Sequence, residues 1–235
     1  MADNIAVVVG VGRGLGWALV RHFSRAGMSV VAASRRPQAL SDAAKENLPN
    51  VHLRACDASA PTDVATLFET VVTELGRPNL VVFNAGAYER GDVIDIHPDD
   101  FDRCWRLGCF GGFVVGREAA RLMLPAATGT IIFTGATASL RGSAGFANLA
   151  VPKFGLRALS QSMARELGPK GIHIAHVIID DGQIESERYR ELLPKRGSDS
   201  LLAPEAIAEA YYNLHLQQRS AWTLELDLRP WTEKF

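Results

Sequence analysis

Cysteine is scarce in this sequence, and its spacing matches no metal or redox motif. The three cysteines, Cys56, Cys104 and Cys109, are odd in number and include no C-x-x-C pair. This pattern excludes a framework of paired disulfides and gives no indication of a zinc site. The six histidines form no cluster in the sequence either. We therefore expect no metal site and a reducing, cytoplasmic environment.

The sequence also lacks an excess of charge and any long apolar run. Its 25 Lys and Arg residues are balanced by 26 Asp and Glu residues, which gives no reason to expect nucleic acid or an anionic membrane as a partner. No apolar run reaches the length of a membrane span, and Arg13 comes too early for a signal peptide. Because the 235 residues contain no repeat, linker or low-complexity segment, they suit a single α/β domain.

The most informative stretch is residues 5–27, where an apolar run leads through glycines into a helical pattern. Residues 5–9 are apolar and rich in β-branched side chains, and from Leu15 the apolar residues recur with helical spacing as far as Gly27. The glycines in between are Gly10, Gly12, Gly14 and Gly16. Backbone N–H groups and the helix dipole of such a turn attract an anion, and glycines leave room for a pyrophosphate. A turn without a ligand would have the same pattern.

The rest of the chain alternates between buried strands and helical patterns. Apolar runs predict strands at about 5–9, 28–33, 51–55, 80–83, 129–133, 172–179 and 221–228. Helical spacing predicts helices at about 15–27, 38–46, 62–75, 99–124, 150–167, 184–193 and 204–217. This alternation implies right-handed crossovers and a doubly wound, Rossmann-type parallel sheet with helices on both faces, in one domain spanning 1–235. We expect residues 182–203 to form a substrate loop or lid.

The glycine spacing, at positions 10, 14 and 16, resembles the G-x-x-x-G-x-G turn of the short-chain dehydrogenase/reductase family. Three later segments resemble that family in the right order. They are the N-A-G at 84–86, the stretch KFGLRALSQSMARELGPKGI at 153–172, and DGQIES at 181–186, which is similar to the family's P-G-x-I-x-T loop. In that loop Asp181 replaces the usual proline and Ser186 the usual threonine. The resemblance covers nearly the whole chain and implies a nicotinamide-dependent oxidoreductase.

Basic residues come after the second predicted strand, at the position that meets the adenosine ribose in this topology. An acidic residue there would bind the ribose 2′-hydroxyl and repel a 2′-phosphate. This chain has instead Ser34, Arg35 and Arg36, with Arg13 in the glycine turn. Because a guanidinium group is a natural partner for phosphate, we predict NADP(H) rather than NAD(H) as cofactor. The alternative is that these arginines are solvated surface residues.

The resemblance implies further cofactor contacts after the other strands. In the family, an acid at the position of Asp57 accepts from the adenine amino group, small residues after the fourth strand let the backbone pass beneath the cofactor, and the loop after the sixth strand meets the nicotinamide amide. The residues implied are Leu15, Asp57, Asn84, Ala85, Gly86, Thr134, Lys153, Gly182, Ile184 and Ser186.

The sequence departs from the family at the catalytic positions. The family uses a serine, a tyrosine thirteen residues later, a lysine four residues further on, and an asparagine on the long helix. When Lys153 is matched to that lysine, Leu149 falls at the tyrosine, Ala136 at the serine and Gly108 at the asparagine. Only the lysine remains. Because Leu149 and Ala136 have no proton to donate, the family's usual proton relay cannot operate here.

Other side chains are candidates for the missing proton donor. Tyr88 comes shortly after the N-A-G segment, and Thr137 and Ser139 lie next to the position of the missing serine. Asp180 and Asp181 could act as acids if burial raised their pKa values. The alternatives are a tyrosine at the rim, hydroxyls in a turn and carboxylates that cap a helix.

These observations are compatible with two functions of different kinds. The first is an NADP(H)-dependent oxidoreductase with a non-standard proton donor, acting on a small carbonyl or alcohol of apolar character, because Phe146, Leu149 and Ile184 would line its pocket. The second is a catalytically silent NADP(H)-binding sensor or partner subunit. The missing tyrosine, serine and asparagine favour the second, whereas Lys153 and the nicotinamide loop favour the first. A purely structural subunit is a third option.

Four glycines, Gly108, Gly111, Gly112 and Gly116, crowd the long predicted helix. Each costs about 1 kcal/mol of helix stability relative to alanine, so a close approach of another helix or of the cofactor is expected in return. The family resemblance implies that this helix and the Lys153 helix pair across a two-fold axis in a homodimer or homotetramer. Packing within one chain is the alternative.

Overall fold

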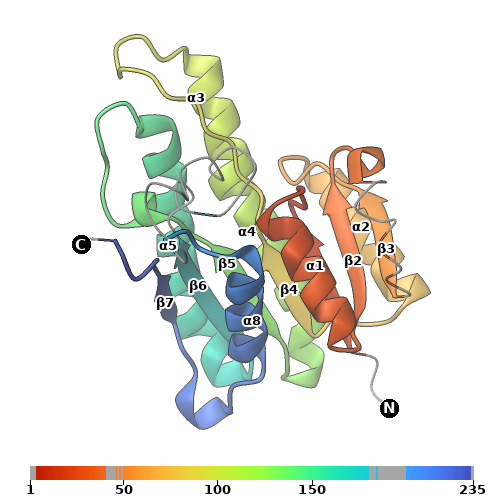
Figure 1. The fold of residues 1–235 in the computed structure, drawn as a ribbon. Coiled ribbons are helices and arrows are strands. Elements are labelled where there is room, and N and C mark those ends of the chain that lie inside the picture. Colours follow the sequence, from red (N-terminus) through yellow and green to blue (C-terminus); the bar gives the residue numbers. More distant parts are fainter. Residues whose placement is uncertain are drawn as a thin grey trace.

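The computed structural model describes residues 4–40, 46, 48, 50–179, 184 and 200–233. Its centre is a seven-stranded parallel sheet with the strand order β3-β2-β1-β4-β5-β6-β7 (Figure 1). The strands are β1 (Ile5–Val9), β2 (Ser29–Ser34), β3 (Val51–Ala55), β4 (Leu80–Phe83), β5 (Thr130–Thr134), β6 (His173–Ile179) and β7 (Glu225–Leu228). The strand order changes direction at β1 and β4, which confirms the predicted doubly wound sheet.

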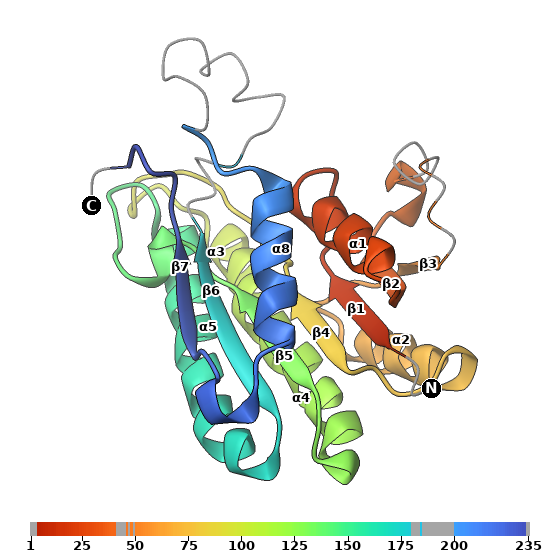
Figure 2. The same cartoon turned by 60° about the horizontal axis from the view of Figure 1, so that its bottom comes forward.

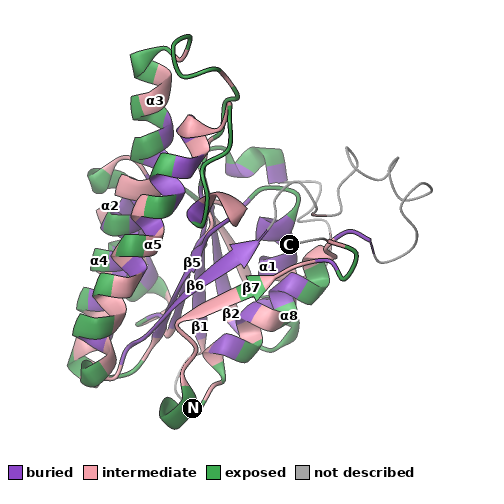
Figure 3. Ribbon diagram, turned by 90° about the vertical axis from the view of Figure 1, so that its left-hand side faces the viewer, coloured by how far each residue is buried: buried purple, intermediate pink, exposed green. Residues whose placement is uncertain are grey.

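Helices cover both faces of the sheet. On one face lie α1 (Leu15–Arg25) and α8 (Pro204–His215), and on the other lie α2 (Pro61–Glu74), α4 (Gly111–Met123) and α5 (Ala147–Leu167) (Figure 2). Because successive strand residues point to opposite faces, Val7 packs in the core beneath α2 and α4, and Val8 in the core beneath α1 and α8. The inner strands are therefore buried between the helical layers, whereas the edge strands β3 and β7 are only partly buried, as Figure 3 shows for β7 beside β6.

The long predicted helix at 99–124 is three segments in the structure. It starts as α3 (Pro98–Trp105), passes through a π-helical turn at Arg106–Phe110 and continues as α4. A Cβ on Gly111 would lie 2.8 Å from the Ala58 carbonyl oxygen, and one on Gly112 would overlap the Leu156 side chain. These glycines therefore let α4 approach its neighbours within the same chain, which was the alternative expectation.

Pro152 lies inside α5 rather than at its start. The sequence suggests a helix that begins near residue 150, but α5 begins at Ala147, so that Pro152 removes one N–H from its second turn. Its ring packs against the π-helical turn, where a Cβ on Gly108 would lie 3.0 Å from the Pro152 Cβ. The glycine on one helix thus accommodates the proline on the other.

Several remaining expectations are met only in part. The helix predicted at 38–46 is a short 3-10 turn at Pro37–Leu40, and most of residues 41–49 lie outside the described ranges. The predicted helix at 184–193 and most of the loop at 182–203 also lie outside them, although Ile184 forms an isolated parallel bridge with Leu202. No helix in the described ranges is both long and apolar enough to span a membrane.

Candidate cofactor and active site

The carboxyl ends of the central strands open into one elongated cleft made of two adjoining hollows. The first has a volume of about 300 Å³ and is lined by Gly10, Gly12, Gly14, Leu15, Gly16, Asn84, Gly86, Ala87, Tyr88, Thr134, Leu149, Lys153 and Ile184. The second has a volume of about 260 Å³ and is lined by Val9, Gly10, Val11, Gly12, Ser34, Arg35, Cys56, Ala58, Asn84, Ala85, Gly86 and Leu107. They share Gly10, Gly12, Asn84 and Gly86, so the cleft is continuous from Arg35 to Lys153.

The glycine turn forms the floor where the two hollows meet. Gly10 has a φ of +97°, and a Cβ there would overlap the backbone of Ala85. The Gly10 amide donates to the Ala33 carbonyl at 2.9 Å, and the Asn84 side-chain amide donates to the Gly10 carbonyl at 3.0 Å. A Cβ on Gly12 or Gly14 would meet nothing within 4 Å, which leaves open space above the turn and at the start of α1.

The second hollow, at the carboxyl end of β2, contains polar groups that can bind a ligand. The Ser34 hydroxyl is buried without a hydrogen-bond partner in the described part of the chain. Burial alone would raise the pKa of Asp57, but two hydrogen bonds from Ser59 and the charge of Arg35 lower it below its ordinary value. Asp57 is therefore an ionised acceptor beside Arg35. Arg13 reaches over the 3-10 turn to the Ala39 carbonyl at 3.5 Å.

The structure brings together most of the predicted cofactor residues, with a few exceptions. Arg13, Arg36 and Asp57 are absent from the lining of the two hollows, although Asp57 lies within electrostatic range of Arg35. Gly182 and Ser186, like Asp180 and Asp181, lie outside the described residues. The sequence analysis missed Val11, Cys56, Ala58, Ala87 and Leu107, which are small or apolar and carry no motif signal.

Lys153 is the charged side chain at the other end of the cleft. Only 5% of it is exposed, and its Nζ donates to the Thr134 carbonyl at 2.7 Å. The Thr134 hydroxyl is 2.9 Å from the hydroxyl of Tyr211, a fully buried residue of α8 that the sequence analysis did not single out. Tyr88 and Leu149 line the same hollow. The structure therefore places Lys153, Thr134 and Tyr88 together.

Thr137 and Ser139, the other predicted catalytic residues, do not line the hollow that holds Lys153. Thr137 Oγ1 accepts a hydrogen bond of 2.6 Å from Arg229. Ser139 is fully buried; its Oγ accepts from the Ala136 amide at 3.1 Å and lies 3.3 Å from His176 Nε2. Both hydroxyls are thus engaged elsewhere in the fold.

His176 belongs to a polar network beneath the cleft. Burial lowers its pKa to about 4, and its Nδ1 lies 3.9 Å from Glu225 Oε1. Arg157 donates to both oxygens of Glu225, at 2.6 and 2.8 Å, and these bonds lower the pKa of Glu225 to about 2. At neutral pH the imidazole is therefore uncharged and the carboxylate is ionised.

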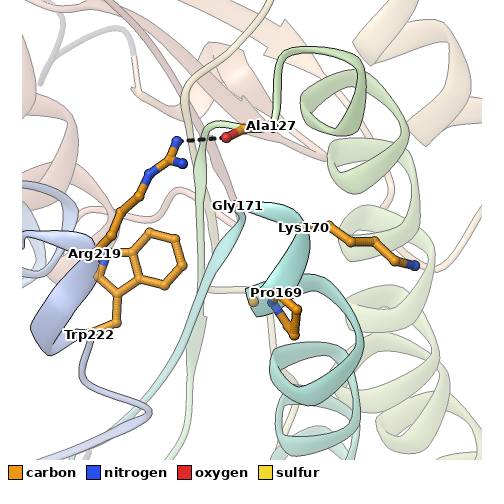
Figure 4. A pocket seen from close by; sticks show the side chains of 7 residues that line it. Ala127, Pro169, Lys170, Gly171, Arg219 and Trp222 are labelled. Carbon is orange, nitrogen blue, oxygen red and sulfur yellow. Dashed lines mark hydrogen bonds between the residues drawn. The ribbon is translucent and has the colours of Figure 1, made fainter.

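A larger hollow of about 590 Å³ lies near the amino ends of the strands, opposite the cleft (Figure 4). Its lining includes Ala127 and Gly171, which precede β5 and β6, so it is remote from Lys153. Arg219 donates to the Ala127 carbonyl at 2.7 Å, and Lys170 lies 3.6 Å from Glu166. Its cations are therefore already partnered. Among the described residues, no group of three His, Cys, Asp or Glu could hold a metal ion.

Comparison with known proteins identifies relatives of this chain. The (21S)-21-acetoxyl-apo-melianone synthase SDR of Melia azedarach is 33% identical over 179 residues, which cover 74% of this chain and 65% of that protein. The chain therefore spans less than two thirds of this relative.

Two solved structures are similar to the chain over almost its whole length. A short-chain dehydrogenase from Rhodopseudomonas palustris has a TM-score of 0.85 and 36% identity, with 98% of this chain and 100% of that chain covered. A metagenomic short-chain oxidoreductase in complex with NADP has a TM-score of 0.84 and 25% identity, with 98% of each chain covered. The sequence pattern described as short chain dehydrogenase matches residues 4–195. This match covers well over half of the residues and includes all of the strands from β1 to β6. The chain therefore belongs to the short chain dehydrogenase family.

Proposed function

We propose that this protein is an NADP(H)-dependent oxidoreductase acting on a small carbonyl compound or alcohol. The observation that carries the proposal is the continuous cleft from Ser34 and Arg35, across the glycine turn, to Lys153. The cleft fits the cofactor, because a buried Ser34 hydroxyl and a guanidinium group stand at one end and open space lies above Gly12 and Gly14. The NADP in the metagenomic relative supports the choice of cofactor.

When bound, the cofactor supplies or accepts the hydride at its nicotinamide. The residues of this chain then bind the dinucleotide and orient the carbonyl. The Lys153 ammonium, held at the Thr134 carbonyl, adds a positive charge to the hollow, where it favours developing negative charge on the substrate oxygen. We propose Tyr88 as the proton donor, because its phenol lines the same hollow and Leu149 has no proton to give.

The cofactor preference has a direct test in Arg35→Ala. We expect the Kd for NADPH to rise by about 10-fold or more and the Kd for NADH to stay nearly unchanged, because a charge-assisted hydrogen bond contributes roughly 1.5–3 kcal/mol. The measurement is a fluorescence titration of each cofactor. Arg77→Ala, which removes an exposed arginine that precedes β4, is the matched control. Equal weakening of both cofactors would contradict a 2′-phosphate contact.

The proton donor is tested with Tyr88→Phe. This change keeps the ring and removes only the hydroxyl, so we expect the NADPH affinity to be unchanged and turnover to fall by about 10²-fold or more. The measurement is NADPH oxidation with an aldehyde substrate found by screening. Unchanged turnover would remove Tyr88 from this role.

A silent NADP(H)-binding sensor or partner subunit is the second candidate, favoured by Leu149, Ala136 and Gly108 at the positions aligned with the family's tyrosine, serine and asparagine. Tight NADPH binding without turnover of any carbonyl in a broad panel would favour it over the enzyme.

We also propose that the chain forms a homodimer or homotetramer through α3, α4 and α5. Large apolar side chains are exposed on these helices, among them Trp105, Phe113, Val151 and Phe154, each between 37% and 44% exposed. Exposed apolar side chains that share one face are typical of a protein interface.

A further inference from the structure

Two loops that are distant in the sequence are hydrogen-bonded to each other at the mouth of the Lys153 hollow. The loop after β4 and the loop before α5 are joined by a hydrogen bond of 3.2 Å from the Gly91 amide to the Gly145 carbonyl. The Asn148 side-chain amide donates to the Glu89 carbonyl at 3.3 Å. Gly145 has a φ of +77°, and a Cβ there would lie 3.3 Å from Arg90 Nε. The arginine side chain therefore lies directly against the second loop.

Three side chains from these loops stack on one another. The rings of Tyr88 and Phe146 are nearly parallel, at 11°, with their centroids 5.2 Å apart. The guanidinium carbon of Arg90 lies 5.5 Å from the centroid of Phe146. Tyr88 lines the hollow that contains Lys153 and Leu149. Through Phe146, the stack therefore connects Tyr88 in the Lys153 hollow with the exposed guanidinium group of Arg90.

Arg90 carries a charge that no carboxylate of the described residues compensates. Its neighbour Glu89 is paired with Arg103, and no ion pair links Arg90 to any residue in the part of the chain that the structure describes. A guanidinium group placed over a ring uses its flat face, and its N–H groups remain available at the edge. That edge suits a carboxylate, which accepts two parallel hydrogen bonds from arginine.

We infer that Arg90 binds an anionic group of the substrate and that the substrate is a carbonyl compound with a flat, apolar body ending in a carboxylate. The apolar body would lie against Tyr88, Leu149 and Ile184, which line the hollow, with the carbonyl toward Lys153. This inference rests on the proposed oxidoreductase function and assigns its substrate class, with Arg90 as a specificity-determining residue.

The test compares 4′-formylbiphenyl-4-carboxylate with its methyl ester, using the protein with NADPH. We expect the acid to have a KM about 10-fold lower than the ester, because one charge-assisted hydrogen bond accounts for a factor of that size. Arg90→Gln should abolish this preference by raising the KM of the acid, with kcat and the NADPH affinity unchanged. Arg77→Gln makes the same change in net charge at an exposed site before β4 and should preserve the preference.

The outcomes separate this inference from the proposed function. Equal KM values for acid and ester, or equal losses on both in Arg90→Gln, would overturn it. If neither compound is reduced, binding of each to the NADPH complex is measured by calorimetry. Tighter binding of the acid that depends on Arg90 would support the anion site and reject only the activity; no preference in binding would overturn the anion site as well.

Discussion

Replacing Gly10 by alanine is expected to lower the free energy of unfolding by about 4 kcal/mol or more. The φ of +97° is a conformation that costs a non-glycine residue roughly 1–3 kcal/mol. The added Cβ would also overlap the Ala85 backbone, and overpacking of this kind costs roughly 1–3 kcal/mol more even where side chains can yield. The backbone of Ala85 cannot move aside as a flexible side chain can. The measurement is equilibrium unfolding in urea, monitored by circular dichroism.

Gly12→Ala is the matched control for this prediction. Its φ is not positive, and an added Cβ would meet nothing within 4 Å. We expect a change in stability of no more than about 0.5 kcal/mol. The new methyl group would nevertheless project where we place the cofactor, so NADPH binding should weaken. A loss of stability in Gly12→Ala similar to that in Gly10→Ala would contradict the distinct roles given to the two glycines.

Acidification from pH 6.5 to pH 4 is expected to cost the fold roughly 6 kcal/mol. Burial lowers the pKa values of His176 and His215 from 6.5 to about 4. Between these values the unfolded chain binds protons that the folded chain does not, so the free energy of unfolding falls as the pH falls. Each ring contributes roughly 3 kcal/mol, at 1.36 kcal/mol for each unit of pKa, and the loss is complete below about pH 4.

The pKa of His176 also depends on the charges of neighbouring side chains. Besides burial, the charges of Lys153 and Arg157 lower its pKa, whereas Glu225 raises it. Glu225 itself has a pKa lowered to about 2 by its hydrogen bonds from Arg157, so its own contribution is present above pH 4.5 and is lost between pH 4.5 and 2. On acidification, the stability contributed by the uncharged histidines is therefore lost before the stability contributed by the Glu225 carboxylate.

The measurement is urea unfolding at several pH values between 7.5 and 4. His176→Gln should make the dependence on pH less steep without abolishing it, because burial also lowers the pKa values of His215 and His173, which remain. His97→Asn, at a side chain that is 68% exposed and caps α3, should leave the slope unchanged. A free energy of unfolding that stays constant from pH 6.5 to 4 would show that these rings are protonated in the folded state.

The parts of the fold that depend on local pattern could be predicted from the sequence. The apolar run before Gly10 and the helical spacing after Leu15 are properties of consecutive residues, and the structure has β1 and α1 there. The clustering of Asn84, which follows β4, and Thr134, which ends β5, is a consequence of the parallel topology, because the carboxyl ends of the strands in such a sheet meet at the same side. The cleft was therefore predictable in outline.

Features that depend on contacts between distant segments could not be predicted. Nothing in the sequence near Tyr211 indicates that its hydroxyl meets Thr134, because the contact joins α8 to the end of β5. The stacking of Phe146 on Tyr88 likewise depends on how two loops meet. Thr137 and Ser139 lie near the expected serine in the sequence, but the turn at Thr137–Ser139 directs their side chains to Arg229 and His176.

The contact between Gly108 and Pro152 limits the order in which this protein can change during evolution. A side chain at position 108 would begin with a Cβ 3.0 Å from the Pro152 Cβ, so any larger residue there meets the proline ring first. An asparagine gained at position 108 would therefore strain against the proline ring unless Pro152 is lost beforehand or in the same step. In the opposite direction, the glycine at position 108 has to come before the proline at position 152. Both directions therefore pass through an intermediate with glycine at position 108 and a residue other than proline at position 152.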